Sequence, residues 1–357
     1  MEQIQKTPMK LLSKILKSLL LLLAILVLVY FLGPKVAKPN LDTSLPTVSS
    51  DLAQLEQWIN SKEKAITNIK PNNEACIVWF DSVPAKTEYS IVYLHGWSAS
   101  QMEGHPLHVN MAKRYGCNLY LPRLAGHGLD EEEAMLNLTA DEVLDSAKEA
   151  IAVAKQLGNK VIIMATSTGG TLGLHLAGGD KDIVALLLYS PNIEIYDKNA
   201  KLLTGHWGLQ LAKAVKKSDY HEFEANEEKQ KYWTTKYRVE ALTHLQALID
   251  YTMVPETFKK VTQPVFMGYF YQNDSIQDKV VSVPAMLKMF DELGTPEGQK
   301  RKKAFPDAGD HVMTSYITSK DLESVERETE KFLEEVLTLR PVVLDSVEVA
   351  VPEAIKD

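Results

Sequence analysis

Cysteine is scarce in this chain, which has only Cys76 and Cys117 among its 357 residues. Two cysteines are too few for a disulfide scaffold, a four-cysteine zinc site or an iron–sulfur cluster. One disulfide bridge is the most that they can form. The length itself allows two domains or one large domain, either of which can bury a full core.

The chain also lacks an excess of basic residues. Its 39 Lys and Arg stand against 47 Asp and Glu, which gives a net charge of −8. A protein that neutralises the phosphates of a nucleic acid needs the opposite balance, so no nucleic-acid partner is expected. With 45% hydrophobic and 24% charged residues the composition is that of an ordinary globular protein. This excludes a disordered, collagen-like or polytopic membrane protein.

No phosphate-binding glycine motif is present. Gly169, Gly170 and Gly173 do not have the G-x-G-x-x-G spacing, and no Gly-Lys-Ser/Thr motif follows them. His105 and His108 are expected on the surface of a helix rather than as metal ligands. We therefore expect neither a metal nor any other cofactor.

One hydrophobic run departs from this composition. It extends from Leu19 to Leu32 without a polar residue, and four lysines precede it. A helix of this length spans about 21 Å, short of the ~30 Å hydrocarbon core, which favours a signal peptide. If Lys14 and Lys17 extend their ammonium groups to the headgroups, however, residues 11–32 span about 33 Å. That length crosses a membrane.

The sequence favours an uncleaved anchor, because a cleavable signal needs small residues in an A-x-A-like pattern and Lys35 occupies one position of the nearest candidate, which ends at Ala37. A secreted protein with a cleaved signal is the alternative. Four lysines before the run and two after it predict a cytoplasmic N-terminus and an extracytoplasmic remainder. The three prolines within residues 33–50 then predict a semi-extended spacer.

Beyond a short amphipathic helix near Leu52, apolar β-branched runs alternate with helical patterns. This alternation predicts an α/β fold, with a mostly parallel central sheet and helices on both faces. The stretch from about 192 to 261 is too long for a loop and is predicted to be an inserted helical cap. The expected segments are 1–37, basic segment and membrane anchor; 38–69, spacer and amphipathic helix; 70–191, first part of the core; 192–261, helical cap; 262–340, second part of the core; and 341–357, C-terminal tail.

The strongest chemical signal surrounds Ser167. An apolar strand from Val161 runs directly into a helical pattern through Ala165-Thr166-Ser167-Thr168-Gly169. A serine at such a bend takes a strained backbone conformation that exposes its Oγ, and only small residues fit two positions to either side. The segment resembles the nucleophile elbow G-x-S-x-G of α/β-hydrolases, with Ala165 in place of the first glycine.

In the α/β-hydrolases an acid and then a histidine follow the serine along the chain. Asp274 and Asp278 both follow the predicted strand that begins at Pro264. The family's pattern is an aspartate followed shortly by two apolar residues, which Asp278 matches better. His311 is the only one of the nine histidines beyond both acids. The resemblance thus implies the catalytic residues Ser167, Asp278 and His311.

A second turn resembles the same superfamily. A strand ends in His95-Gly96, as does the family's third core strand, whose following backbone N–H forms half of the oxyanion hole. The resemblance implies that the backbone N–H groups of Trp97 and Thr168 form this hole. We interpret His95 and His127, which lies in an Arg-Gly-His-Gly-like loop, as structural.

Over about residues 70–340 the chain resembles monoacylglycerol-lipase or lysophospholipase-like serine hydrolases of the serine aminopeptidase type, which implies the α/β-hydrolase fold with a cap. The family's strand order would make the strands of Cys76 and Cys117 neighbours, so a bridge and two free thiols are both open.

The resemblance implies a membrane-anchored serine hydrolase of carboxylic esters that acts on a small-molecule or lipid ester, such as a monoacylglycerol or lysolipid. Peptidase and thioesterase activity on the same residues, or a non-catalytic binding scaffold, are the alternatives. Dehalogenase and epoxide-hydrolase activity is disfavoured, because relatives with these activities need an aspartate where Ser167 stands. The sequence does not indicate an oligomeric state.

Overall fold

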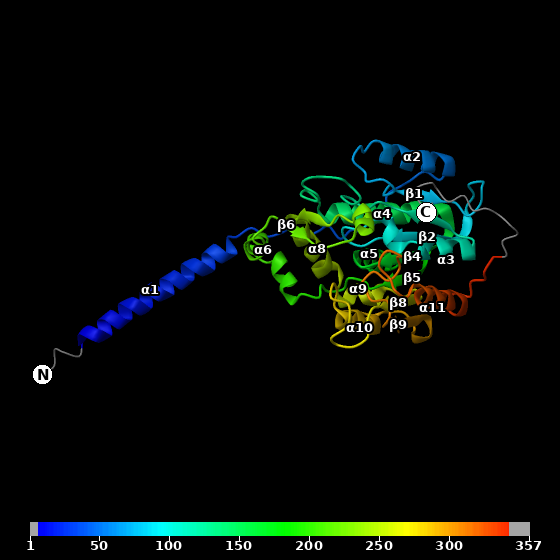
Figure 1. Cartoon of the computed structure of the whole chain (residues 1–357). Coiled ribbons are helices and arrows are strands. Elements are labelled where there is room, and N and C mark those ends of the chain that lie inside the picture. The colour runs from blue at the N-terminus through cyan, green and yellow to red at the C-terminus, as the bar shows by residue number, and fades with distance from the viewer. Residues whose placement is uncertain (1–5, 343–357) are drawn as a thin grey trace.

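The computed structural model, which describes residues 6–342, is built on a seven-stranded sheet with the order β1-β3-β2-β4-β5-β8-β9 (Figure 1). Strand β1 runs antiparallel to β3, and all other neighbours in the sheet are parallel. The expected mostly parallel sheet is confirmed. The strands are β1 (Cys76–Val78), β2 (Thr87–Leu94), β3 (Asn118–Leu121), β4 (Gly158–Thr166), β5 (Ile183–Tyr189), β8 (Val265–Tyr269) and β9 (Lys300–Ala304).

The central strand β4 is apolar at successive positions because both faces of the sheet are covered. Val161, Ile163 and Ala165 belong to the hydrophobic core on one face, and Ile162 and Met164 belong to the core on the other. A strand that buries both faces has no polar side to alternate with, which is why it appears in the sequence as a continuous apolar run.

Helices cover both faces, as expected. The helices α2 (Leu52–Lys64), α4 (Ala140–Leu157), α5 (Thr168–Ala177), α9 (Pro255–Lys260) and α10 (Val283–Glu292) contribute to the first core. The second core is covered by α3 (Leu107–Tyr115) and α11 (Leu322–Glu335). Helix α4 is fixed at its start by a capping box, in which the side chains of Thr139 and Glu142 each bond the other's backbone N–H.

The segment between β5 and β8 is mostly helical, as expected, but it also contains a two-stranded antiparallel sheet of β6 and β7. The sequence pattern does not reveal this small sheet because each strand has only three residues, too few for a readable alternation. We call residues 192–261 the cap. Its elements are η2 (Lys198–Thr204), α6 (Gly208–Lys216), β6 (Tyr220–Glu222), α7 (Glu227–Tyr232), β7 (Lys236–Arg238), α8 (Val239–Thr252) and the helix α9 given above.

Helix α1 (Lys6–Phe31) projects away from the rest of the molecule (Figure 1). Its segment Leu11–Phe31 is long and apolar enough to cross a membrane, and none of it is buried against the protein. A signal sequence near an N-terminus has the same length and composition. The geometry of the helix is therefore that of a membrane span or of a signal.

The spacer predicted after α1 does not extend freely from the body. Residues 33–50 contain no helix or strand, yet Pro39 is buried and Leu45 and Val48 pack against the core. The backbone N–H of Asn40 donates to the Asp141 carboxylate at the start of α4. The prolines favour an extended chain, and this chain lies along the surface of the fold. Most of the expected C-terminal tail, residues 343–357, lies outside the described residues.

The two cysteines are free and far apart. In the antiparallel register of β1 and β3, Cys76 lies opposite Leu121. Cys117 precedes Leu121 by four residues, which along an extended strand is about 13 Å. A disulfide needs Cα atoms about 4.4 to 6.8 Å apart, so neighbouring strands are not sufficient for a bridge.

This separation predicts two free thiols per chain. Titration of the purified protein with a thiol reagent, in denaturant and without reductant, should count both Cys76 and Cys117. Burial raises the pKa of each thiol to about 12, so the native protein should react slowly with the same reagent. A count of no thiols in the denatured chain would contradict the register of β1 and β3.

Candidate active site

Ser167 lies in a strained turn between β4 and α5. Its backbone has φ 54° and ψ −120°, outside the regions that L-residues favour. A side chain at Gly169 would place its Cβ 1.8 Å from the carbonyl oxygen of Leu94, so only glycine allows α5 to pass so close to the end of β2. Ala165, at the position of the other small residue, is completely buried within β4.

His311 and Asp278 meet above the ends of β8 and β9. His311 Nδ1 lies 2.6 Å from Asp278 Oδ2. The other oxygen, Oδ1, accepts hydrogen bonds from the backbone N–H groups of Val280 (2.8 Å) and Val281 (3.0 Å). The two apolar residues after Asp278 thus supply the N–H groups that fix its carboxylate, and Oδ2 is left to orient the imidazole.

The charges of this pair stabilise each other. Burial opposes the charged carboxylate, but the imidazolium of His311 and the N–H groups of Val281 and Val280 outweigh it and lower the pKa of Asp278. For His311 burial opposes the charged ring, and the charge and hydrogen bond of Asp278 outweigh it, which raises the pKa above 6.5. The arrangement therefore increases the proton affinity of His311.

Asp274, the alternative acid, has a different environment. It is exposed, and its Oδ1 accepts a hydrogen bond from the Tyr271 hydroxyl at 2.8 Å. The structure thus brings Asp278, and not Asp274, to His311.

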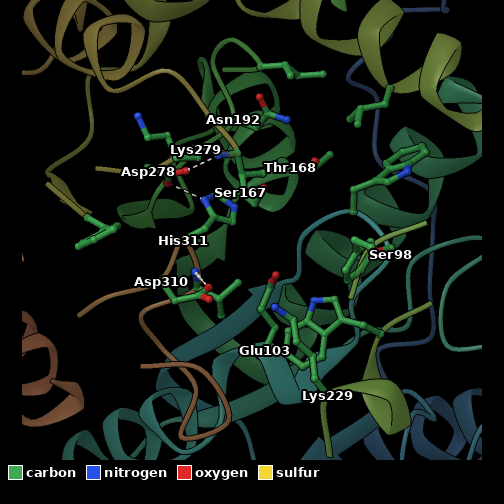
Figure 2. Close-up of a pocket in the computed structure, with 18 of the residues that line it drawn as sticks. Ser98, Glu103, Ser167, Thr168, Asn192, Lys229, Asp278, Lys279, Asp310 and His311 are labelled. Carbon is green, nitrogen blue, oxygen red and sulfur yellow. Dashed lines mark hydrogen bonds and ion pairs between the residues drawn. The ribbon is translucent and has the colours of Figure 1, made fainter. Parts of the chain in front are cut away.

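Ser167 and His311 both line one cavity and point into the same space (Figure 2). Within residues 6–342 the buried Nε2 atom of His311 has no hydrogen-bond partner. The hydrogen bond between a catalytic nucleophile and its base is commonly long until substrate closes the site. His311 Nε2, the ring nitrogen that faces away from Asp278, can therefore accept a proton from a group in the cavity.

Two backbone N–H groups border the same cavity. Trp97 follows the turn at the end of β2, and Thr168 is the first residue of α5. In the described part of the chain neither backbone N–H donates a hydrogen bond to another backbone group. Free N–H groups beside a nucleophile are the donors that an oxyanion hole requires.

The cavity has a volume of about 580 Å³ and is mostly apolar. Its apolar wall comes largely from the cap. Three further buried polar atoms have no partner among the described residues, namely Trp97 Nε1, Thr168 Oγ1 and Asn192 Oδ1. The lining combines polar and charged groups, among them those beside Ser167, with an apolar wall of Ile195, Phe223, Trp233, Tyr237, Leu242, Leu245 and Phe270.

His95 and His127 serve the loops, as expected. His95 Nε2 accepts a hydrogen bond from Leu124 N–H at 3.1 Å, and its ring packs edge-on against His127. Burial lowers the pKa of both, to about 3 for His95 and about 4 for His127, so both rings are neutral at pH 7. The expectation of a surface position for His108 is wrong, because this ring is fully buried beside Tyr93.

Glu103, Asn192 and Lys229 also line the cavity, and the sequence pattern did not single them out. Glu103 belongs to η1 (Gln101–Gly104) and is buried. Charged and amide side chains are usually solvated, and no motif distinguishes these three. Among the described residues there is no group of three or more His, Cys, Asp or Glu side chains that could hold a metal ion.

The family model of the alpha/beta hydrolase family matches residues 91–316. This range includes both turns at the cavity and ends beyond His311. It covers more than half of the 357-residue chain.

A curated relative is the thermostable monoacylglycerol lipase of Bacillus sp. (strain H-257), with 30% identity over 105 residues. The match covers 29% of this chain, and it spans only 41% of the length of that relative.

Solved structures of lipases and esterases share the fold. One from a study of the metagenome-derived lipolytic enzymes LipS and LipT has a TM-score of 0.56 at 16% identity, covering 75% of this chain and 99% of that one. Est1E from Butyrivibrio proteoclasticus gives a TM-score of 0.51 at 17% identity, over 74% and 94%. A soluble variant of the Saccharomyces cerevisiae monoglyceride lipase gives 0.51 at 13%, over 73% and 91%.

The α/β-hydrolase fold that the elbow and the His-Gly turn predict is thus confirmed. The family model also extends over the residues that form the cavity. The chain belongs to the alpha/beta hydrolase family.

Proposed function

We propose that this protein is a serine hydrolase that cleaves carboxylic esters through an acyl-enzyme on Ser167. The observation that carries the proposal is the 2.6 Å contact of His311 Nδ1 with Asp278 Oδ2, at a cavity that Ser167 enters from a strained turn. The family membership, and the presence of lipases and esterases among the relatives, support the same chemistry.

In this mechanism Ser167 Oγ attacks the ester carbonyl carbon while His311 Nε2 takes the hydroxyl proton. The tetrahedral intermediate collapses, the ester C–O bond breaks, and the same imidazolium protonates the leaving alcohol. A water molecule then gives a proton to His311, attacks the acyl-enzyme and releases the acid, and the proton returns to Ser167. Asp278 stays ionised throughout and orients the ring.

The negative charge of the intermediate would develop on the former carbonyl oxygen. The backbone N–H groups of Trp97 and Thr168 would stabilise it by about 3 to 4 kcal/mol per donor. Because backbone groups supply these bonds, they need no reorganisation when the charge forms.

The substrate in this proposal carries an acyl chain. The apolar cap wall of the cavity suits a hydrocarbon, and the polar atoms beside Ser167 suit an ester and a hydroxylated or charged headgroup. A monoacylglycerol or a lysolipid has both parts, and the names of two relatives, a monoacylglycerol lipase and a monoglyceride lipase, support this substrate class.

We further propose that α1 is an uncleaved anchor and that the hydrolase lies on the extracytoplasmic side. The helix has an apolar segment of 21 residues, Leu11–Phe31, and four lysines occur before Leu19. The contacts of residues 33–50 with the folded body keep that body close to the end of this helix. A membrane-partitioned ester would then meet the enzyme at high local concentration.

Replacement of the nucleophile tests the proposal. Ser167→Ala should reduce hydrolysis of p-nitrophenyl butyrate by about 10³-fold or more, because no other group in the cavity replaces Oγ. The thermal midpoint should change little, since the side chain makes no hydrogen bond that the turn depends on. Ser82→Ala, at a serine in the loop between β1 and β2, is the control and should keep full activity. Activity of Ser167→Ala within a few-fold of wild type would remove Ser167 as the nucleophile.

The two aspartates give a matched comparison. Asp278→Asn should lower kcat by roughly 10³- to 10⁴-fold, because the amide no longer holds the imidazole in the productive tautomer. Asp274→Asn, four residues away and exposed, should lose less than a few-fold. Steady-state kinetics on one soluble ester measure both. A larger loss in Asp274→Asn would show that the acid is misassigned.

A further inference from the structure

The end of helix α1 is packed against the cap. The rings of Tyr30 and Phe31 lie edge-on to the ring of His206, with centroids 5.6 and 5.7 Å away. His206 Nδ1 donates a hydrogen bond to the carbonyl oxygen of Gly33 at 2.7 Å. The first residues after the apolar run are therefore fixed on the segment that joins η2 to α6.

Trp207 continues this contact. Its indole Nε1–H donates to the Val29 carbonyl oxygen at 3.1 Å, and its backbone N–H donates to the Pro34 carbonyl oxygen at 2.8 Å. A Cβ on Gly33 would lie 2.0 Å from Trp207 Nε1, so the chain and the indole are in close contact. The hydrogen bond to Val29 reaches the last turn of α1, so the cap helps to fix the direction of this helix.

An exposed apolar surface surrounds this junction, and we call it the α6 surface. Leu211 and Val215 are four residues apart on α6 and so share one face of the helix, with 45% and 74% of each residue exposed. Lys213 lies on the other side of α6, where its ammonium pairs with Asp219 and Glu240. The α6 surface consists of Leu202, Trp207, Leu211 and Val215.

Exposed lysines border the α6 surface. Lys35 follows the apolar run, and Lys216 and Lys217 end α6. Amphipathic helices that lie in a membrane interface have this combination of an apolar face with flanking basic residues, and tryptophan and tyrosine are enriched at the same depth. Figure 1 shows α6 beside the point where α1 leaves the body.

We propose that the α6 surface lies in the interfacial layer of the membrane that α1 crosses, with lipid as its partner. This inference rests on the proposed anchor. The last turn of α1 marks the membrane boundary, and the contacts of His206 and Trp207 bring η2 and α6 to that boundary. Lipid is favoured over a protein partner because the apolar α6 surface is continuous with the apolar end of α1.

The end of α6 also lies next to the cavity. Lys216 Nζ at the end of α6 lies 3.0 Å from His221 Nδ1 on β6, and His221 lines the cavity together with Phe223. The end of α6 therefore contacts a residue of the cavity wall.

Fluorescence quenching tests this inference with the full chain. The protein is reconstituted in phosphatidylcholine vesicles that contain a lipid with a nitroxide near the top of its acyl chain. Bimane is attached to cysteine variants at two positions of the α6 surface, Leu211→Cys and Val215→Cys. Leu22→Cys within α1 is the positive control, and Val83→Cys, exposed between β1 and β2, is the negative control. The unsubstituted chain, labelled in parallel, measures the signal from the native cysteines.

Labels at 211 and 215 should be quenched several-fold more than the label at 83. Quenching at 22 with none at 211 or 215 would overturn the inference and leave the anchor standing, and a label at 211 that is shielded from water yet unquenched would indicate a protein partner instead. Absence of quenching at 22 would overturn the anchor and the inference with it. Because the readout does not involve hydrolysis, it is separate from the test of the ester chemistry.

An independent inference concerns Glu103, a carboxylate buried beside the nucleophile and with only 2% of its surface exposed. Its Oε2 accepts a hydrogen bond from the backbone N–H of Gly96 at 2.6 Å. Its Oε1 and Ser167 Cβ both lie within 3.0 Å of the point where a Cβ on Gly96 would be. The carboxylate thus holds the turn that precedes Trp97.

The segment that contains Glu103 is also hydrogen-bonded to the segments that contain Ser167 and His311. Thr314, three residues after His311, donates its hydroxyl proton to the Glu103 carbonyl oxygen at 2.7 Å. The Tyr93 hydroxyl lies between Glu103 Oε2 (3.3 Å) and Thr166 Oγ1 (2.9 Å), next to Ser167. In the view of Figure 2, Glu103 and Asp278 are on different sides of His311.

We propose that Glu103 is a positioning residue of the hydrolase, which holds the Gly96 turn and places a second carboxylate charge toward His311. The inference rests on the proposed function. Burial raises the pKa of Glu103 to about 7, and the charge of His311 opposes this rise, so the two groups titrate as a coupled pair. The titratable or charged groups that face this pair are Tyr93 on β2, Lys229 on α7, and Asp278 and Asp310 beside His311.

Two variants of Glu103 separate its role in holding the Gly96 turn from the effect of its negative charge on His311. Glu103→Ala frees the Gly96 N–H and should lower kcat by roughly 100-fold, as loss of an oxyanion donor does, with little change in KM. Glu103→Gln keeps an oxygen that can accept the Gly96 N–H, so its kcat should fall less. It removes a negative charge that favours the imidazolium, so the acid limb of kcat/KM should move to lower pH.

The pH profile of Glu103→Gln decides between this role and a merely structural one. An acid limb unchanged from wild type would overturn the proposal, whatever the loss in Glu103→Ala. If the wild-type protein hydrolyses no ester, the proposed function fails first and is recognised separately, because that result does not depend on Glu103.

Discussion

The site depends on the close approach of helix α5 to the end of β2. Gly169 allows the first turn of α5 to lie against the Leu94 carbonyl, and this contact fixes the bend at Ser167. The strained conformation there costs of the order of 1 to 3 kcal/mol and persists only where the surroundings hold it. Here the N–H of Ser167 donates to the Tyr189 carbonyl on β5, and its carbonyl accepts from Asn192 N–H, so β5 and the segment after it both hold the bend. The apolar core on both faces of the sheet thus supports the bend at Ser167.

The parallel sheet brings the other groups to the same place. Strands β2, β4, β5, β8 and β9 run parallel, so the loops that follow them gather at one edge of the sheet. Trp97, Ser167, Asp278 and His311 all come from such loops. The electrostatic arrangement follows, since a buried imidazole near two carboxylates gains proton affinity. A site that must accept and return a proton near neutral pH benefits from this.

Much of this arrangement could be predicted from the sequence, because the decisive signals are local. The apolar run from Val161 into Ser167 and Gly169 specifies a strand, a turn and a helix within ten residues. The two apolar residues that follow Asp278 favour it over Asp274, and the backbone N–H groups of those same residues bind its carboxylate. The histidine must follow the aspartate along the chain, and His311 is the one histidine that does.

What could not be predicted depends on contacts between residues far apart in the chain. Glu103 accepts hydrogen bonds from Thr314 and Tyr93, and the end of α1 packs against His206. The short β6 and β7 carry no periodicity, and His108 is buried by packing against Tyr93 that its own helix does not reveal.

The central claim is that Ser167 is an activated nucleophile, and covalent labelling tests it most directly. The full chain is treated with a fluorophosphonate probe, and digested peptides are mapped by mass spectrometry. We predict one adduct on Ser167 in the native protein and no adduct after heat denaturation, because the reactivity comes from His311 and the turn rather than from serine itself. Absence of an adduct on Ser167, or labelling of a different serine in the native protein, would contradict it.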